Sequence, residues 1–155
     1  MVDINLFPEA LASLNERVAR YLAIKGEKLT RLRYHILSIL VLANKPLKGY
    51  AIVELARERG WSLSPASVYR TLNFFIECGL VHKVNSLNAF VACLENLDGQ
   101  GHNAVLLVCP DCHKTLEIND RLLTAELFKR LSALGFSIDF GAVEVSGMCQ
   151  ECAAK

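Results

Sequence analysis

The stretch SPASVYRTLNFFIECG (64–79) decides the fold of the first half of the chain. Ser64 is a typical helix N-cap, Pro65 suits the first helical position, and Gly79 is the residue type that most often follows a helix end. Between these signals, apolar residues recur at the spacing of one buried helical stripe. They are Val68, Leu72, Phe75 and Ile76. The stretch therefore predicts a capped amphipathic helix.

The segments on either side of this helix extend the pattern to a winged helix-turn-helix. Three stretches before it have helical periodicity, and each ends at Gly or Pro. They are LFPEALASLNERVARYLAIKG (6–26), LTRLRYHILSILVLANKP (29–46) and GYAIVELARERG (49–60). After it, LVHKVNSLNAFVAC (80–93) has the composition of a β-hairpin, and we place its turn at Leu87-Asn88. In this order of elements, 64–79 is the recognition helix and the hairpin is the wing.

The second half of the chain predicts a small sheet with one helix. LENLDGQG (94–101) has no period and indicates a linker. Strand patterns and one helical pattern follow: strands in NAVLLVC (103–109), KTLEI (114–118) and FSIDFGAVEVSG (136–147), and a helix in DRLLTAELFKRLSALG (120–135). One helix on one sheet face would leave apolar surface over, which suggests a homodimer.

We therefore predict an α+β protein in three parts. A winged-helix DNA-binding domain would span residues 1–93, a hinge linker residues 94–102, and a β-β-α-β dimerisation domain residues 103–155. The charge distribution agrees with such a division. Residues 1–90 hold 12 Lys and Arg against 7 Asp and Glu, whereas residues 91–155 hold 5 against 9. This asymmetry suggests domains with different partners.

The composition is that of an ordinary globular protein, with 155 residues, 52% apolar residues and a net charge of +1. The longest strongly apolar run, ILSILVLA (36–43), is too short to cross a bilayer, and the N-terminus has no signal-peptide pattern. We expect a cytoplasmic protein that does not associate with membranes. Its six cysteines are then expected to be thiols or metal ligands rather than disulfides.

Two CxxC pairs, Cys109/Cys112 and Cys149/Cys152, have the spacing of a four-thiolate zinc site. The alternative is a redox dithiol, but such a motif opens a helix after a strand and occurs singly. A closed four-ligand site has no open position, so we expect no enzymatic activity from it. His113 stands where zinc knuckles often have Gly, and we interpret it as a turn residue because His tolerates positive φ better than most residues.

A second set of candidate ligands surrounds the linker. With the turn placed as above, His82 lies directly across the hairpin from Cys93, close enough for both to bind one ion. His102 at the end of the linker and Glu117 on the next strand would complete a tetrahedral N/N/S/O set suited to zinc. The alternatives are a solvated His and a buried structural Cys, and the sequence by itself does not bring Glu117 to this place.

Together these motifs resemble the ferric uptake regulator family of bacterial metal-sensing repressors, from about residue 20 to residue 152. The segments that carry the resemblance are LTRLRYHIL (29–37), PASVYRTLNFFIECGLVHKV (65–84), His102 separated by six residues from CPDC (109–112), and CQEC (149–152). Iron- and peroxide-sensing members typically have an HHDH-like cluster before the first CxxC. This chain has one His there and adds the thiolate of Cys93, so it is most similar to the zinc uptake regulator branch.

The resemblance implies a zinc-responsive repressor of zinc uptake genes that binds palindromic double-stranded DNA as a homodimer. It implies two Zn²⁺ ions per chain, one structural and one regulatory. The structural ligands would be Cys109, Cys112, Cys149 and Cys152, and the regulatory ligands His82, Cys93, His102 and Glu117. The assignment of Glu117 depends mainly on the resemblance.

Candidate DNA contacts lie on the face of the recognition helix opposite the buried stripe, namely Ser67, Tyr69, Arg70 and Asn73. Arg70 is the predicted base reader, because a guanidinium can bridge the two major-groove acceptors of guanine. The family resemblance adds Tyr50. Lys83 on the wing, and Arg31 and Arg33 at the start of the second helix, could contact phosphates.

Three other functions remain open at this point. The chain could sense iron, manganese or nickel within the same family. It could be a zinc-stabilised adaptor that uses the winged helix to bind protein. It could also be a thiol oxidoreductase that uses CPDC.

Overall fold

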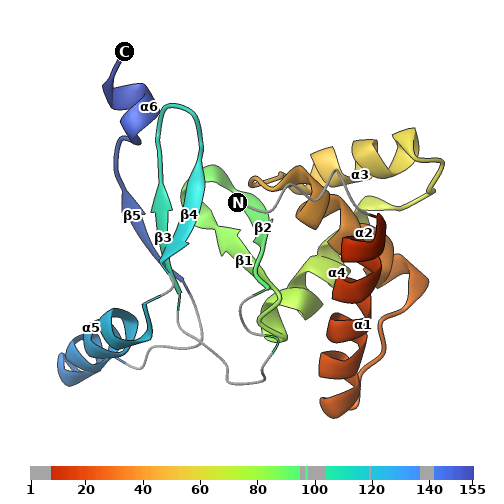
Figure 1. Cartoon of the computed structure of the whole chain (residues 1–155), viewed down its shortest axis with the longest axis horizontal. Coiled ribbons are helices and arrows are strands. Elements are labelled where there is room, and N and C mark those ends of the chain that lie inside the picture. Colours follow the sequence, from red (N-terminus) through yellow and green to blue (C-terminus); the bar gives the residue numbers. More distant parts are fainter. Residues whose placement is uncertain (1–7, 95–96, 98–103, 119, 137–141) are drawn as a thin grey trace.

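The computed structural model describes residues 8–94, 97, 104–118, 120–136 and 142–155. The first four helices and the wing form one part of the molecule, and a three-stranded sheet with the remaining helices forms the other (Figure 1). We call residues 8–94 the N-terminal module and residues 104–155 the C-terminal module. None of the described helices is long and apolar enough to cross a membrane. The predicted α+β class is confirmed by the structure, although its finer boundaries at 1–93, 94–102 and 103–155 stay a prediction.

The N-terminal module contains four helices and a hairpin in the predicted order. These elements are α1 (Pro8–Ile24), α2 (Arg31–Ala43), α3 (Gly49–Glu58), α4 (Pro65–Glu77), β1 (Val81–Val84), the 3-10 turn η2 (Asn85–Leu87) and β2 (Ala89–Ala92). Their inner faces form one core, in which the fully buried side chains include Val18, Leu22, Ile36, Leu40, Ile52, Val68, Leu72, Phe75 and Leu80.

The capping signals of the sequence are present in the structure. The Ser64 hydroxyl accepts a hydrogen bond from the backbone N–H of Ser67, which satisfies one of the otherwise unpaired amides at the start of α4. Thr30 does the same for α2 through the N–H of Arg33. Gly79 follows α4 at φ +73°, a conformation that glycine adopts without strain.

The register of the wing differs from the prediction by two residues. The turn is made by η2, with Asn88 in the left-handed region at φ 47°, so His82 pairs with Val91 instead of Cys93. Cys93 lies one step past β2, where its N–H donates to the carbonyl oxygen of Leu80. Side chains alternate between faces with a period of two, so a shift of two leaves His82 and Cys93 on the same face. A shift of one would have separated them.

The C-terminal module has β3 (Ala104–Val108) at the centre of its sheet. It pairs antiparallel with β4 (Thr115–Ile118) and parallel with β5 (Ala142–Ser146). Alternation gives this sheet two different faces. Leu106 and Val108 point to a buried face, where they pack with Val84 and other residues of the wing. Leu107 points to the opposite face.

The helix of the C-terminal module is not where the sequence analysis placed it. α5 (Arg121–Ala133) lies beyond the lower end of the sheet rather than on a face of it (Figure 1). Only Thr124 and Phe128 of this helix are buried. The expectation of one helix covering one sheet face is therefore wrong, because the wing covers that face instead. The sequence analysis also missed the single-turn helix α6 (Gln150–Ala153), so the CQEC pair opens a helix.

A stacked ring pair lies on the N-terminal module. The imidazole of His35 on α2 lies parallel to the indole of Trp61, with 3.8 Å between centroids and 6° between planes. Burial, and then the nearby Arg31 charge, keep the pKa of His35 below its ordinary value.

Candidate metal centres and DNA-binding surface

The four cysteines of the two CxxC pairs meet at one end of the C-terminal module. Cys109 and Cys112 lie on the turn between β3 and β4, and Cys149 and Cys152 lie at the start of α6. All four Sγ atoms are within 4.8 Å of one another. We call this set the four-cysteine cluster. Soft thiolate donors in a compact group of four are the set that tetrahedral Zn²⁺ accepts.

Backbone amides make one of these thiols unusually acidic. The N–H groups of Cys112 and then Cys149 point at the Cys109 sulfur, the latter at 3.5 Å, and they lower the pKa of Cys109 to about 6. The pKa of Cys152 is raised, first by the carboxylate of Asp111 and then by the Cys149 thiol. The Cys109 thiol thus ionises readily, whereas the Cys152 thiol resists ionisation. A cation in the cluster would remove that resistance.

The turn that carries the first pair is closed by its own backbone. The N–H of Cys109 donates to the carbonyl oxygen of Lys114 at 2.9 Å, and the N–H of His113 donates to that of Cys109 at 3.0 Å. His113 has φ 61°, which agrees with its predicted role as a turn residue. An ion pair that the sequence did not reveal, Lys114 to Glu151 at 2.9 Å, joins this turn to α6. Neither residue carries a spacing signal that would have predicted it.

The second cluster bridges the two modules. The ligand atoms of His82, Cys93 and Glu117 lie within 4.8 Å of one another. The Nε2 atom of His82 is 3.5 Å from Glu117 Oε2, and the Cys93 sulfur is 3.8 Å from Glu117 Oε1. We call these three residues the hinge cluster. His82 and Cys93 come from the wing and its exit, whereas Glu117 comes from β4.

The donor set of the hinge cluster fits a borderline-soft cation, because it combines an imidazole, a thiolate and a carboxylate. The structure thus brings Glu117 to the place that the resemblance implied. The fourth predicted ligand, His102, lies outside the described residues. Nothing in the described chain replaces it, so its role stays a prediction.

Most of the predicted DNA contacts are exposed on the N-terminal module. Arg70 and Asn73 on α4 and Lys83 on β1 are exposed. Tyr50 at the start of α3 is 60% exposed and Tyr69 on α4 is 44% exposed. The Tyr69 ring lies against Gly49, where an added Cβ would be 2.5 Å from its Cζ, and contacts the Phe90 ring edge-on. Tyr69 therefore joins α3, α4 and the wing.

Two of the predicted contacts also serve the fold. The Ser67 hydroxyl shares a hydrogen bond of 2.8 Å with the N-cap residue Ser64. Arg33 is held by Glu27 at 3.0 Å and by the Lys28 carbonyl oxygen at 2.6 Å, and its guanidinium lies 3.3 Å from the centroid of the Phe74 ring. Arg33 thus packs α2 on α4, and its contact with phosphate stays a prediction.

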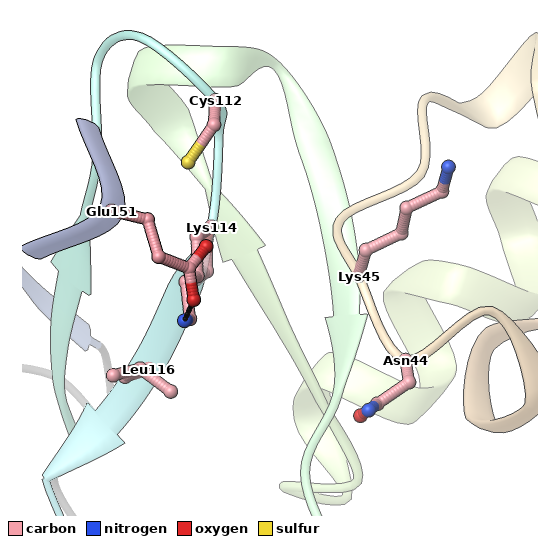
Figure 2. Close-up of a pocket in the computed structure, with 7 residues that line it drawn as sticks. Asn44, Lys45, Cys112, Lys114, Leu116 and Glu151 are labelled. Atoms are coloured by element: carbon pink, nitrogen blue, oxygen red, sulfur yellow. Dashed lines mark hydrogen bonds and ion pairs between the residues drawn. The ribbon is translucent and has the colours of Figure 1, made fainter. Parts of the chain in front are cut away.

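An open cleft separates the modules beside the four-cysteine cluster. It has a volume of about 710 Å³. Figure 2 shows Cys112 above the Lys114–Glu151 ion pair on one wall and Asn44 and Lys45 on the other. Contact between the modules is therefore made through the wing.

The chain matches a known protein family over most of its length. A sequence profile described as the Ferric uptake regulator family matches residues 24–146. The chain belongs to this family. The Zinc uptake regulation protein of Escherichia coli K12 is 28% identical over 130 residues, which cover 84% of this chain and 75% of that protein. The protein of the same name from Mycobacterium tuberculosis H37Rv is 28% identical over 130 residues, which cover 82% of this chain and 95% of that protein. The predicted family resemblance is confirmed.

Solved structures of the family superpose on most of the chain. A crystal structure of holo XcZur is 37% identical, with a TM-score of 0.78 and coverage of 92% of this chain and 99% of that chain. A zinc uptake regulator complexed with zinc and DNA is 26% identical, with a TM-score of 0.80 and coverage of 93% and 95%. A crystal structure of apo XcZur is 36% identical, with a lower TM-score of 0.51 and coverage of 92% of this chain and 97% of that chain. The arrangement of this chain is thus nearer to the holo form of XcZur than to its apo form.

Proposed function

We propose that this chain is a zinc-responsive DNA-binding transcriptional regulator that acts as a homodimer and represses zinc uptake genes. The observation that carries the proposal is the hinge cluster, because its donors come from both modules. A cation bound there would fix the wing, and with it the recognition helix α4, relative to the C-terminal module. The likeness to holo XcZur and to a zinc uptake regulator complexed with zinc and DNA supports zinc as the signal and DNA as the partner.

The two clusters would have different roles. The four-cysteine cluster lies within one module, so its cation would hold the β3–β4 turn and α6 together irrespective of the signal. The hinge cluster brings fewer thiolates and joins two modules, so it would be filled only when zinc is plentiful. His82, Cys93 and Glu117, with His102, would hold the regulatory ion. The chain would then hold two Zn²⁺ ions.

DNA recognition would follow from the exposed face of α4. Arg70 would read base edges. Tyr69, Asn73 and Ser67 on the same helix, Tyr50 at the start of α3 and Lys83 on the wing would contact the DNA beside it. Two copies of this surface in a dimer would read the two halves of a palindrome. The apolar side chains exposed on the C-terminal sheet support dimerisation through that module.

The test is a metal titration of DNA binding. Duplexes that bind the zinc-loaded protein are first selected from a random pool. Fluorescence anisotropy of a selected duplex is then followed while zinc, iron(II), manganese(II) or nickel(II) is added to protein that holds only its structural ion. We expect specific binding to rise with zinc at the lowest free concentration. If another metal activates DNA binding at a lower free concentration, that metal and not zinc is the signal. If no duplex sequence is selected from the pool, a protein-binding adaptor is favoured.

A further inference from the structure

The buried face of the C-terminal sheet presents two carboxylates in one row. Leu106 on β3 pairs with Glu117 on β4 on one side and with Glu144 on β5 on the other. Paired residues of neighbouring strands point to the same face of a sheet. Glu117 and Glu144 therefore flank Leu106, and both face the wing.

Each carboxylate contacts a different part of the wing. Glu117 reaches the side chain of His82 in the hinge cluster. Glu144 reaches the turn of the hairpin, where its two oxygens accept hydrogen bonds from backbone N–H groups: Oε1 from Asn85 and Oε2 from Ser86 at 3.1 Å. His82 and Asn85 are three residues apart along the same strand and turn, so the two contacts hold neighbouring parts of one element.

The contact of Glu144 is part of a packed interface. Between the two carboxylates, Val84 of the wing is buried in a small core with Leu106 and Val108. Leu87 and Val91 of the wing pack against the same core. The pKa of Glu144 is below its ordinary value: burial by itself would raise it, and the hydrogen bonds from Asn85 and Ser86 outweigh that effect. A charged acceptor makes these bonds stronger than neutral ones.

We propose that Glu144 is a positioning residue for the hinge cluster, which holds the tip of the wing on β5 and so brings His82 and Cys93 to Glu117 before metal binds. The proposal rests on the proposed function. A site whose ligands come from two modules binds more weakly when the modules must first be ordered. The hydrogen bonds of Glu144 go to the backbone of Asn85 and Ser86 at the turn of the wing, and they reduce that ordering cost.

The first test measures zinc binding at the hinge site in protein whose four-cysteine cluster is already loaded. Glu144→Gln keeps one acceptor oxygen and Glu144→Ala keeps none. Competition with a chromophoric chelator should show weaker hinge binding by about three-fold for Gln and on the order of ten-fold for Ala, as hydrogen bonds of ordinary net strength imply. The matched control is Glu126→Gln, which removes an exposed charge of α5 that pairs only locally with Arg130. It should leave the affinity unchanged.

The second test measures the two hydrogen bonds between Glu144 and the turn of the wing directly. In the same protein, before hinge zinc is added, NMR hydrogen exchange of the Asn85 and Ser86 amides should be faster in both Glu144 variants than in the wild type and the control. If Glu144→Ala fails to fold, Glu144→Gln carries both tests. Unchanged hinge affinity in a variant with faster exchange would overturn the proposal. Wild-type protein that binds zinc at the hinge but no DNA would instead count against the proposed function alone.

Discussion

The surroundings of Cys93 favour a metal site over a merely packed interior at the wing. It is buried, and its sulfur faces a carboxylate oxygen of Glu117 at 3.8 Å. A thiol kept only for packing would have an apolar neighbour there. The other lone cysteine, Cys78, has that kind of environment in the core of the N-terminal module, where burial raises the pKa of its thiol.

Replacement of Cys93 by Ser should therefore remove one zinc ion per chain and leave the other. The four-cysteine cluster is untouched, so the protein should fold and keep its thermal stability, while zinc-dependent DNA binding is lost or needs far more zinc. Metal content after dialysis and anisotropy with a selected duplex measure the two effects. Cys78→Ser is the matched control and should keep both ions. Wild-type zinc response in Cys93→Ser would make Cys93 a packing residue.

Arg70 is exposed on α4 and offers the donor geometry for guanine. Arg70→Ala should lower specific affinity by roughly 1–3 kcal/mol per half-site and twice that for a dimer, without changing zinc content. Binding to the selected duplex and to a scrambled one gives the specificity. Arg57→Ala, an exposed arginine in the last turn of α3, is the control. Equal loss of affinity for both duplexes would make Arg70 a phosphate contact.

At the scale of elements, the helices could be predicted from the sequence because their signals are local. Thr30, Ser64 and Asp120 all cap the helices that follow them, through bonds to amides two or three residues away. The turn of the wing has a weaker local signal. Its 3-10 segment, Asn85–Leu87, contains neither the Asn-Gly pair nor the glycine that marks a tight hairpin turn. His82 and Cys93 share a face of the wing only because the register moved by an even number of residues.

The packing of whole elements could not be predicted in the same way. The amphipathic pattern of 120–135 indicates that α5 has an apolar side but does not say what covers it. The strands of the sheet likewise give no sign that the wing, which precedes them in the sequence, packs on Leu106. Glu117 joins the hinge cluster through this packing, which is why its assignment needed the family resemblance.

The contact of α3 with α4 gives a test at this scale. A Cβ at Gly49 would lie 2.5 Å from the Tyr69 ring. Gly49→Ala should displace that partly exposed ring from Phe90, lowering DNA affinity while changing the free energy of unfolding by about 1 kcal/mol or less, because alanine favours the helix. Urea unfolding and anisotropy measure the two effects.

The double variant Gly49→Ala/Tyr69→Ala is the matched control. If the effect of Gly49→Ala acts through the ring, it should vanish in the Tyr69→Ala background. A persistent loss of DNA affinity in that background would place the effect in the backbone of α3.

At the scale of the molecule, the outer face of the C-terminal sheet is apolar and exposed. Leu107, Leu116 and Val145 are paired across the three strands and are 39%, 51% and 44% exposed. The two faces of this one sheet thus differ: one is covered by the wing of the same chain, and the other is open to a second copy. The dimer proposal rests on this face.

Leu116→Glu should weaken the dimer by at least roughly ten-fold in dissociation constant, because a charge would be buried in an apolar contact. Sedimentation equilibrium of the zinc-loaded protein measures this. The control is Ile24→Glu, at an isoleucine of α1 that is 87% exposed, which should leave the dimer intact. An unchanged dimer in Leu116→Glu would move the interface away from this face.

The stacked pair of His35 and Trp61 has a spectroscopic consequence. Trp61 is the only tryptophan of the chain, so indole emission arises from one ring, and that ring belongs to the helical module. Circular dichroism, in contrast, follows every helix, α5 included. Coincident denaturation curves from the two signals would mean that the modules melt as one cooperative unit, and separated curves would mean that each melts alone. Zinc at the hinge should bring separated curves together.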